Sequence, residues 1–418
     1  MSRRPRTLAT LGTAALAGAA LIAAATPAQA FYLVPPFDTE AGVLSFEDYQ
    51  NTDDSYDLVC TDGEVRTGAP DFTGGPNDAN GTGVRCDQVR IVNIYEDTHG
   101  IEDVDLTAVT AADFPLLKRT RIDTRGNGQN GSETVVGSFL PDRIAGANTA
   151  SGGAGDDVFV GITPASTGTA SVDGGPGDDL AAWDFTEREM RVLTLGSAGF
   201  TYRTNADSPV STVALSNVER VRVLLSDRFY MSGIPTSFDG AGTTIGVDLV
   251  AGTNSNDLTL TTGSGEDAVE SGSGDDTVTL GGGADTARTG GGADTISSRD
   301  GAVDRVFCGS GTDSVTADAE DVLVGCETVS VSAPQTRGIV GPTRVIRGEQ
   351  GVFGFSASTE AATFQCSVDR AAFTTCRSPL AVATKKLKAG KHTLAVRAVV
   401  RGVADATPST ATFTVVER

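Results

Sequence analysis

Four aspartates recur every nine residues near the middle of the chain, and each follows two glycines at a fixed distance. The repeat reads G-x-G-x-D-x-U-x, where U is an apolar residue two positions after the aspartate. The repeated residues are Gly263, Gly265, Asp267, Gly272, Gly274, Asp276, Gly281, Gly283, Asp285, Gly290, Gly292 and Asp294. Carboxylate and main-chain carbonyl oxygens are the ligands that calcium prefers over magnesium or a transition metal. The spacing therefore predicts a series of calcium sites.

Each position of the repeat suits a coil of short strands. Glycine allows a tight turn with positive φ and leaves room for inward-facing carbonyl groups. The apolar residues Val269, Val278, Ala287 and Ile296 are expected to point into a core. Nine residues then form half a coil and eighteen form one rung, so we expect Asp267 with Asp285, and Asp276 with Asp294, to share ions.

At these residues the chain resembles the hemolysin-type, or RTX, calcium-binding family. Further copies of the motif contain Asp157, Asp179 and Asp313. The resemblance implies an all-β fold, a right-handed parallel β-helix or β-roll with rows of Ca2+ along its turns. The motif departs from the family around Asp257 and Asp304, where other residues replace the glycines, and we expect incomplete ligation there.

Composition divides the chain near residue 330. Residues 331–418 carry 12 Lys and Arg against 5 Asp and Glu, whereas the whole chain carries 32 against 54. We predict a signal peptide over 1–30, an N-terminal β cap with the first rungs over 31–130, the repeat roll over 131–330, and a further module over 331–418. A segment over about 183–235, where the repeat lapses, is expected to be calcium-free rungs or a hairpin excursion.

The C-terminal segment resembles a bacterial Ig-like module, which implies a small β-sandwich. Its alternating stretches lie around Phe364 and Leu394. The lysines Lys385, Lys386, Lys388 and Lys391 could contact an anionic cell-wall polymer or the acidic roll, or could simply protect a sheet edge.

The N-terminal residues indicate export. Arg3, Arg4 and Arg6 precede an Ala- and Leu-rich run, and Ala28-Gln29-Ala30 offers a cleavage site. We therefore expect a secreted, extracellular protein, free or held non-covalently at the cell surface.

All six cysteines follow the predicted cleavage site, as an oxidising compartment permits. Fifteen pairings are possible. Proximity favours Cys60 with Cys86, Cys308 with Cys326, and Cys366 with Cys376. A thiolate zinc site is the weaker alternative, because the sequence has no CxxC pair.

The sequence has no motif of a known catalytic centre, and we expect no enzyme. His99 is interpreted as a surface histidine. The main alternative is a calcium-dependent β-helix polysaccharide lyase that uses the basic residues Lys118, Arg119, Arg121 and Arg125. No apolar membrane-active segment precedes the repeats, which argues against a cytolytic toxin.

We thus predict a secreted calcium-binding protein with a structural or adhesive role, in which folding is coupled to ion binding. Its expected partners are calcium ions and, as an adhesive target, cell-wall or extracellular polysaccharide. Net charge is −22, so nucleic acid is not expected to bind, and the sequence predicts no membrane span after the signal peptide.

Overall fold

The computed structural model describes residues 32–33, 41–48, 54–68, 80–96, 101–124, 133–164, 169–185, 192–203, 210–225, 236–252 and 256–418. The predicted signal peptide, His99 and Arg125 lie outside these residues. No helix among the described residues is long and apolar enough to cross a membrane.

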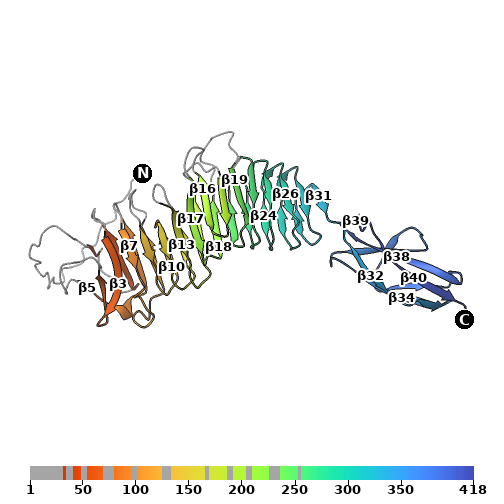
Figure 1. Ribbon diagram of the computed structural model, residues 1–418, viewed down its shortest axis with the longest axis horizontal. Coiled ribbons are helices and arrows are strands. Elements are labelled where there is room, and N and C mark those ends of the chain that lie inside the picture. Colours follow the sequence, from red (N-terminus) through yellow and green to blue (C-terminus); the bar gives the residue numbers. More distant parts are fainter. Residues whose placement is uncertain are drawn as a thin grey trace, which may run out of the picture.

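The described chain up to Val331 forms a long coil of strands that alternates between two sheets (Figure 1). Sheet A contains β1 (Tyr32–Leu33), β2 (Val43–Asp48), β6 (Ile91–Glu96), β8 (Arg119–Asp123), β10 (Asp142–Ala145), β12 (Val158–Val160), β14 (Leu180–Asp184), β18 (Arg220–Leu224), β20 (Gly246–Val250), β22 (Ala268–Glu270), β24 (Thr286–Arg288), β27 (Arg305–Phe307) and β30 (Val322–Val324).

Sheet B faces sheet A across the coil and carries the intervening strands. In spatial order it contains β5 (Asn80–Arg85), β4 (Glu64–Gly68), β3 (Asp54–Thr61), β7 (Ile101–Asp105), β9 (Thr134–Val136), β11 (Thr149–Ser151), β13 (Thr169–Asp173), β17 (Ser211–Ser216), β16 (Gly199–Arg203), β15 (Val192–Gly196), β19 (Thr236–Gly242), β21 (Leu258–Thr261), β23 (Thr277–Thr279), β26 (Thr295–Ser298), β29 (Ser314–Ala317) and β31 (Thr328–Val331). A two-stranded pairing of β25 (Gly291–Gly292) with β28 (Ser310–Gly311) lies in a turn.

Successive rungs stack in parallel register, which confirms the predicted parallel β-helix. Ala268 pairs with Thr286 in sheet A, and Thr277 pairs with Thr295 in sheet B, each eighteen residues on. The nine-residue repeat therefore alternates between sheets, as its half-coil interpretation requires.

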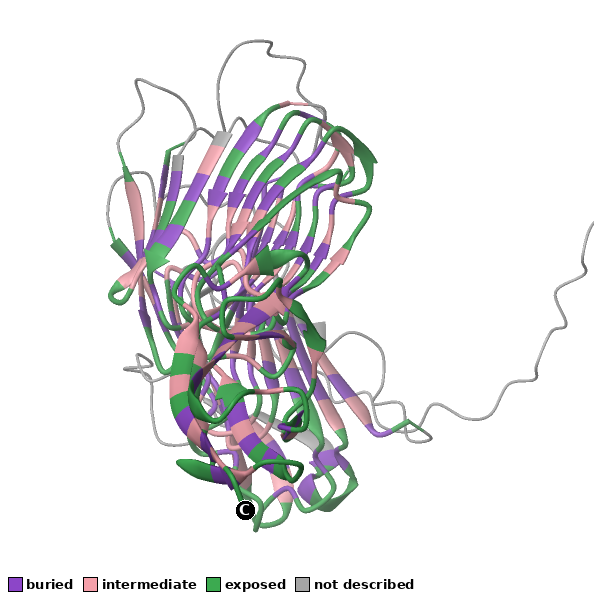
Figure 2. Cartoon of the chain, turned by 90° about the vertical axis from the view of Figure 1, so that its right-hand side faces the viewer, coloured by how far each residue is buried: buried purple, intermediate pink, exposed green. Residues whose placement is uncertain are grey.

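The core fills the space between the two sheets. Buried residues alternate with partly or fully exposed ones along most strands of the coil, as the alternating colours in Figure 2 show. The apolar repeat residues Val269, Val278, Ala287 and Ile296 are at most 3% exposed, so they point inward as predicted.

The segment without repeats is a hairpin excursion within sheet B. Strand β16 runs antiparallel to both β15 and β17, while β17 and β15 join the parallel sheet on either side through β13 and β19. Trp183 stacks on Phe200 with ring centroids 4.7 Å apart, and Tyr202 packs beside them. This aromatic cluster buries the extra strands against the coil.

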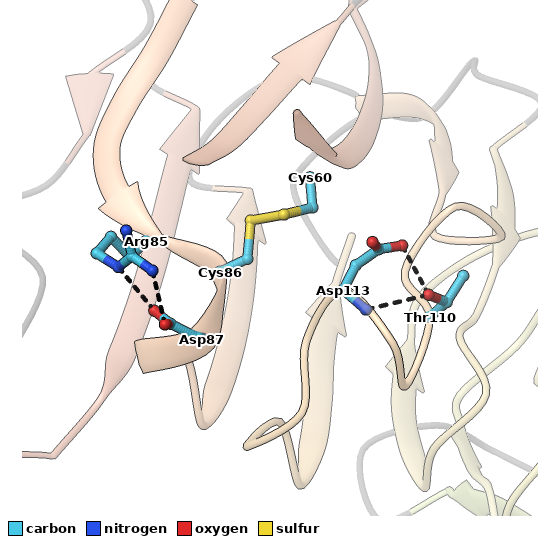
Figure 3. The surroundings of a disulfide bond; sticks show 6 residues. All are labelled: Cys60, Arg85, Cys86, Asp87, Thr110 and Asp113. Carbon is cyan, nitrogen blue, oxygen red and sulfur yellow. Dashed lines mark hydrogen bonds and ion pairs between the residues drawn. A yellow bond between two sulfur atoms is a disulfide. The ribbon is translucent and has the colours of Figure 1, made fainter. Parts of the chain in front are cut away.

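A second excursion lies near the N-terminus, where β3, β4 and β5 form antiparallel pairs. The disulfide Cys60–Cys86 joins β3 to the 3-10 helix η1 (Cys86–Gln88), next to the exposed Arg85–Asp87 ion pair (Figure 3). After η1 the chain enters sheet A as β6, which begins at Ile91, and it then returns to sheet B as β7, which ends at Asp105.

Residues after β31 form a separate sandwich with its own core. One sheet contains β32 (Thr336–Val340), β34 (Gln350–Ala357) and β37 (Leu380–Ala383); the other contains β33 (Arg344–Ile346), β40 (Ser409–Val416), β38 (Gly390–Val400), β35 (Thr363–Val368) and β36 (Thr374–Cys376), with β39 (Val403–Ala404) beside β38. Phe353, Leu394 and Phe413 fill the space between them. The structure is thus all-β in both parts, as predicted.

The sandwich contacts the last rungs of the coil through one end of β38. Val400 packs into the core of the coil, and Arg401 donates a hydrogen bond to the main-chain oxygen of Asp321. The exposed lysines Lys385–Lys391 lie at the other end of β38, about 33 Å away at the usual rise per residue. Among the ion pairs of the described residues none joins these lysines to the acidic roll, and such a contact stays a prediction.

Three disulfides are present, with the pairing that proximity favoured. Cys308–Cys326 ties the residue after β27 to the residues after β30, at the end of sheet A. Cys366–Cys376 links the paired strands β35 and β36. No free cysteine remains for a zinc site.

Candidate metal centres

Acidic residues form two columns along the coil, one at the start of each sheet's strands. We call them column A and column B. Column A contains Asp142, Asp157, Asp179, Glu219, Asp267, Asp285, Asp304 and Asp321, and column B contains Asp276, Asp294, Asp313 and Glu327. The ten aspartates of the columns are at most 3% exposed.

Within a column each acid is tied to the next rung by one main-chain hydrogen bond. The N–H of Asp267 donates to Asp285 Oδ1 at 2.8 Å, and the N–H of Asp285 donates to Asp304 Oδ1 at 2.9 Å. In column B the N–H of Asp276 donates to Asp294 Oδ1, and the N–H of Asp294 donates to Asp313 Oδ1, each at 2.9 Å. This bond fixes the orientation of each carboxylate and satisfies one of its two oxygens.

The second carboxylate oxygen has no partner. The Oδ2 atoms of eight aspartates are buried and make no hydrogen bond. These residues are Asp157, Asp179, Asp267, Asp276, Asp285, Asp294, Asp304 and Asp313. Because a buried acceptor without a partner costs free energy, a regular row of them indicates that something else completes the site.

Burial also disfavours ionisation of these carboxyl groups. Desolvation, together with the charge of neighbouring carboxylates, raises the pKa of Asp157, Asp285 and Asp304 to about 7. The same causes raise the pKa of Asp276 to about 6. At neutral pH the columns therefore need either protons or a bound cation to offset the charge.

The glycines of the repeat allow the turns to stack closely. A Cβ on Gly281 would lie 1.6 Å from the carbonyl oxygen of Gly263 in the preceding rung, so no side chain fits there. Gly283 has a φ of +124°, but Gly281 does not have positive φ. Positive φ therefore accounts for the presence of glycine at only some positions of the repeat. At the others, close approach of the stacked main chains requires glycine.

One turn replaces glycine with a third carboxylate. Among the described residues, side-chain oxygens of Asp285, Asp300 and Asp304 lie within 4.8 Å of one another, and two of these residues are buried. We expected incomplete ligation around Asp304 because Asp300 stands at a glycine position. Incomplete ligation there stays a prediction, but the side chain of Asp300 places a carboxylate oxygen beside those of Asp285 and Asp304.

The residues predicted for the sites all belong to this arrangement. Asp267, Asp285, Asp157 and Asp179 stand in column A, and Asp276, Asp294 and Asp313 stand in column B. The stacking predicted for Asp267 with Asp285 and for Asp276 with Asp294 is observed. Asp257, by contrast, is exposed, in keeping with its missing glycines.

The sequence analysis missed four acids that continue the columns. They are Asp142, Glu219, Asp321 and Glu327. Asp142 follows a proline instead of a glycine pair, and Glu219 follows Asp179 only after the hairpin excursion. The one available signal was the β-branched or arginine-led strand that begins directly after each of them.

The columns have the chemistry of a hard-cation site. They offer carboxylate oxygens beside main-chain turns, with neither sulfur nor imidazole, a donor set that suits Ca2+. The free Oδ2 atoms provide the test of fit, because each is an anionic acceptor that the protein itself leaves unsatisfied. The residues present therefore fit calcium.

Of the basic residues considered for a lyase, Arg119 and Arg121 lie on the outer face of β8 in sheet A. Arg121 pairs in register with Arg143 of the next rung, so cations from two neighbouring strands meet there. Lys118 and Arg119 are exposed nearby.

Comparison with known proteins gave no relative. No protein-family model matches the chain, and no curated protein matches it at a significant level.

Proposed function

We propose that the coil binds several calcium ions and that the protein is a secreted, structural or adhesive member of the RTX type. The observation that carries this proposal is the row of eight buried aspartate Oδ2 atoms without hydrogen-bond partners. A Ca2+ ion bound between two successive turns would offset their charge and supply the missing contacts.

Coupling of binding to folding follows from the same geometry. The carboxylates of Asp267, Asp285 and Asp304 occur on consecutive rungs and are fully or almost fully buried. Without counter-charge, their repulsion and desolvation oppose stacking of the rungs, so the free energy of calcium binding becomes free energy of folding. A low calcium concentration inside the cell would keep the array unfolded until export.

The role outside the cell is proposed from the whole chain. The three disulfides suit an oxidising environment, and the signal-like N-terminus suits export. The coil gives an elongated, strand-rich body with a sandwich at its end (Figure 1), a form that suits a spacer or adhesin.

Calorimetric titration of chelator-treated protein with CaCl2 and then MgCl2 tests the proposal. We expect several calcium ions per chain and much weaker binding of magnesium. Asp276→Asn should lose part of the calcium binding, whereas Asp275→Asn, an exposed neighbour, should keep it. Absence of calcium binding in the wild type would refute the proposal.

A polysaccharide-active enzyme is the second candidate, because Arg121 and Arg143 meet on adjacent strands. Two guanidinium groups could neutralise uronate carboxylates. Assays on pectate, alginate and hyaluronan with calcium test this candidate. We expect no unsaturated product, and a product that Arg121→Ala abolishes would instead establish a lyase.

A further inference from the structure

The outer face of sheet B over its last five strands carries only threonine and serine. These strands are β21, β23, β26, β29 and β31, and each contributes two outward residues. We call these ten residues the threonine face: Thr259, Thr261, Thr277, Thr279, Thr295, Ser297, Ser314, Thr316, Thr328 and Ser330.

The ten residues form two straight files in continuous register. One file runs Thr259, Thr277, Thr295, Ser314 and Thr328, and all five are exposed. The second file lies two residues further along each strand and is partly or fully exposed. Neither file contains a register shift.

Strand geometry alone does not account for this composition. The outer face of sheet A in the same rungs is also open to solvent, yet beside Ala268 and Thr286 it presents Glu270, Arg288, Arg305 and Phe307. Threonine favours any strand, but a preference for strands would act on both sheets. The uniform hydroxyl composition is therefore a property of one face.

The face is a two-dimensional array of ten hydroxyl groups, with methyl groups on its seven threonines. Neighbouring strands are about 4.8 Å apart, and alternate residues along a strand are about 6.6 Å apart. The spacing between strands is close to the shorter repeat of the ice lattice, and the spacing along a strand is somewhat shorter than the longer repeat. The β-branched threonine side chain has few rotamers, so its hydroxyls hold bound water in a regular pattern.

The composition excludes the more usual partners of such a surface. The ten residues of the threonine face carry neither charge nor an aromatic ring on which a sugar could stack. Charges stand at its borders: Arg299 donates a hydrogen bond to the main-chain oxygen of Ser330, and the exposed Asp257 and Asp275 precede the first file. It is also unlike a protein interface, whose centre is rich in aromatic residues and arginine. Ordered water is the partner that this array matches best.

We propose that the threonine face binds ice. The protein would adsorb to an ice surface through two files of hydroxyl and methyl groups whose spacing the main-chain hydrogen bonds of sheet B fix. This inference goes beyond the proposed calcium binding, and its test uses the calcium-loaded full chain.

The test is measurement of thermal hysteresis and of partition into a growing ice hemisphere, in buffer with calcium. We expect the wild type to lower the freezing point below the melting point and to enter the ice. Thr277→Lys, which places a long cation within the array, should abolish both effects.

The matched control is Thr286→Lys, which makes the same change on sheet A in the neighbouring strand. It should keep both effects. Circular dichroism of the two variants, which are both on the surface, establishes that they are folded.

Two results would overturn the proposal. One is a folded wild type without hysteresis or ice partition; the other is equal activity in Thr277→Lys and Thr286→Lys. Retention on insoluble chitin or cellulose that Thr277→Lys alone removes, without ice activity, would assign the face to a glycan instead. Calcium titration of the same samples shows separately whether the proposed function holds.

Discussion

The N–H of Asp267 donates to the Oδ1 atom of Asp285 one rung further on, at 2.8 Å, while Asp285 Oδ2 remains buried without a partner. The same division between a bonded Oδ1 and an unpartnered Oδ2 holds for eight aspartates of the two columns. One oxygen holds adjacent rungs in register, and the other is available to a cation. The predictions below follow from this division.

Removal of one charge from a column should weaken calcium binding and stabilise the metal-free protein. Asp276→Asn keeps the Oδ1 acceptor for Leu258 N–H but removes a buried charge. We expect a lower calcium affinity, together with a higher melting temperature in chelator, because less charge is desolvated. Calorimetry and thermal melts measure the two effects.

Asp275→Asn is the control for this prediction, because Asp275 is the adjacent but exposed acid. Its affinity and melting temperature should remain close to those of the wild type. Equal effects of both substitutions would mean that burial of the columns is irrelevant to binding.

The metal-free protein should become less stable as pH rises through the neutral range. Burial raises the pKa of Asp285 from 3.8 to about 7 in the folded state. Between these values the folded state binds more protons than the unfolded state, so the free energy of unfolding falls as pH increases. Melting temperature in EGTA should therefore decrease from pH 5 to pH 8.

Saturating calcium should remove or reverse that trend, because deprotonated carboxylates bind the ion. A melting temperature in EGTA that rises over the same pH range would contradict the assigned burial of the columns.

Substitution of a stacked glycine should damage the coil, whereas its neighbour should tolerate the same change. A Cβ on Gly281 would lie 1.6 Å from Gly263 O, but a Cβ on Gly282 meets no atom closer than 3.5 Å. Gly281→Ala should cost at least about 1–3 kcal/mol of stability, the usual cost of overpacking. Gly282→Ala should cost far less. Urea unfolding with calcium present compares the stabilities of the two variants. Similar midpoints for both would argue against close stacking of the turns.

The Cys308–Cys326 disulfide should stabilise the end of the coil. It closes a loop with a sequence separation of 18 around the last sheet A turn. Replacement of both cysteines by serine should lower stability by about 3 kcal/mol on chain-entropy grounds. Hydrogen exchange should accelerate first in β27 and β30, and unchanged exchange there would show that the disulfide does not hold this end.

Much of the fold could be predicted because a nine-residue period determines where strands and turns alternate. Asp267 and Asp276 indicated opposite halves of one rung, and they begin strands of opposite sheets. The period could not locate Glu219 or Asp142, because their alignment depends on rungs of unequal length that only the three-dimensional stacking reveals. The uniform surface of sheet B likewise emerges only when residues of five strands lie side by side.

Asp300 shows a second limit of prediction from the repeat motif. At a position where the repeat has glycine, an aspartate suggested a defective turn. In the folded chain its carboxylate lies with those of Asp285 and Asp304. A residue that departs from the motif can therefore still place an oxygen beside the carboxylates of the neighbouring turns.

Circular dichroism and thermal melting of the purified protein at pH 7.5, with calcium and after exhaustive EGTA treatment, test the central claim most directly. We predict that the strand spectrum and the high melting temperature require calcium, are largely lost in EGTA, and return when calcium is restored. A polypeptide that is equally ordered and equally heat-resistant in EGTA, with no bound metal, would contradict the claim that the aspartate columns are cation sites.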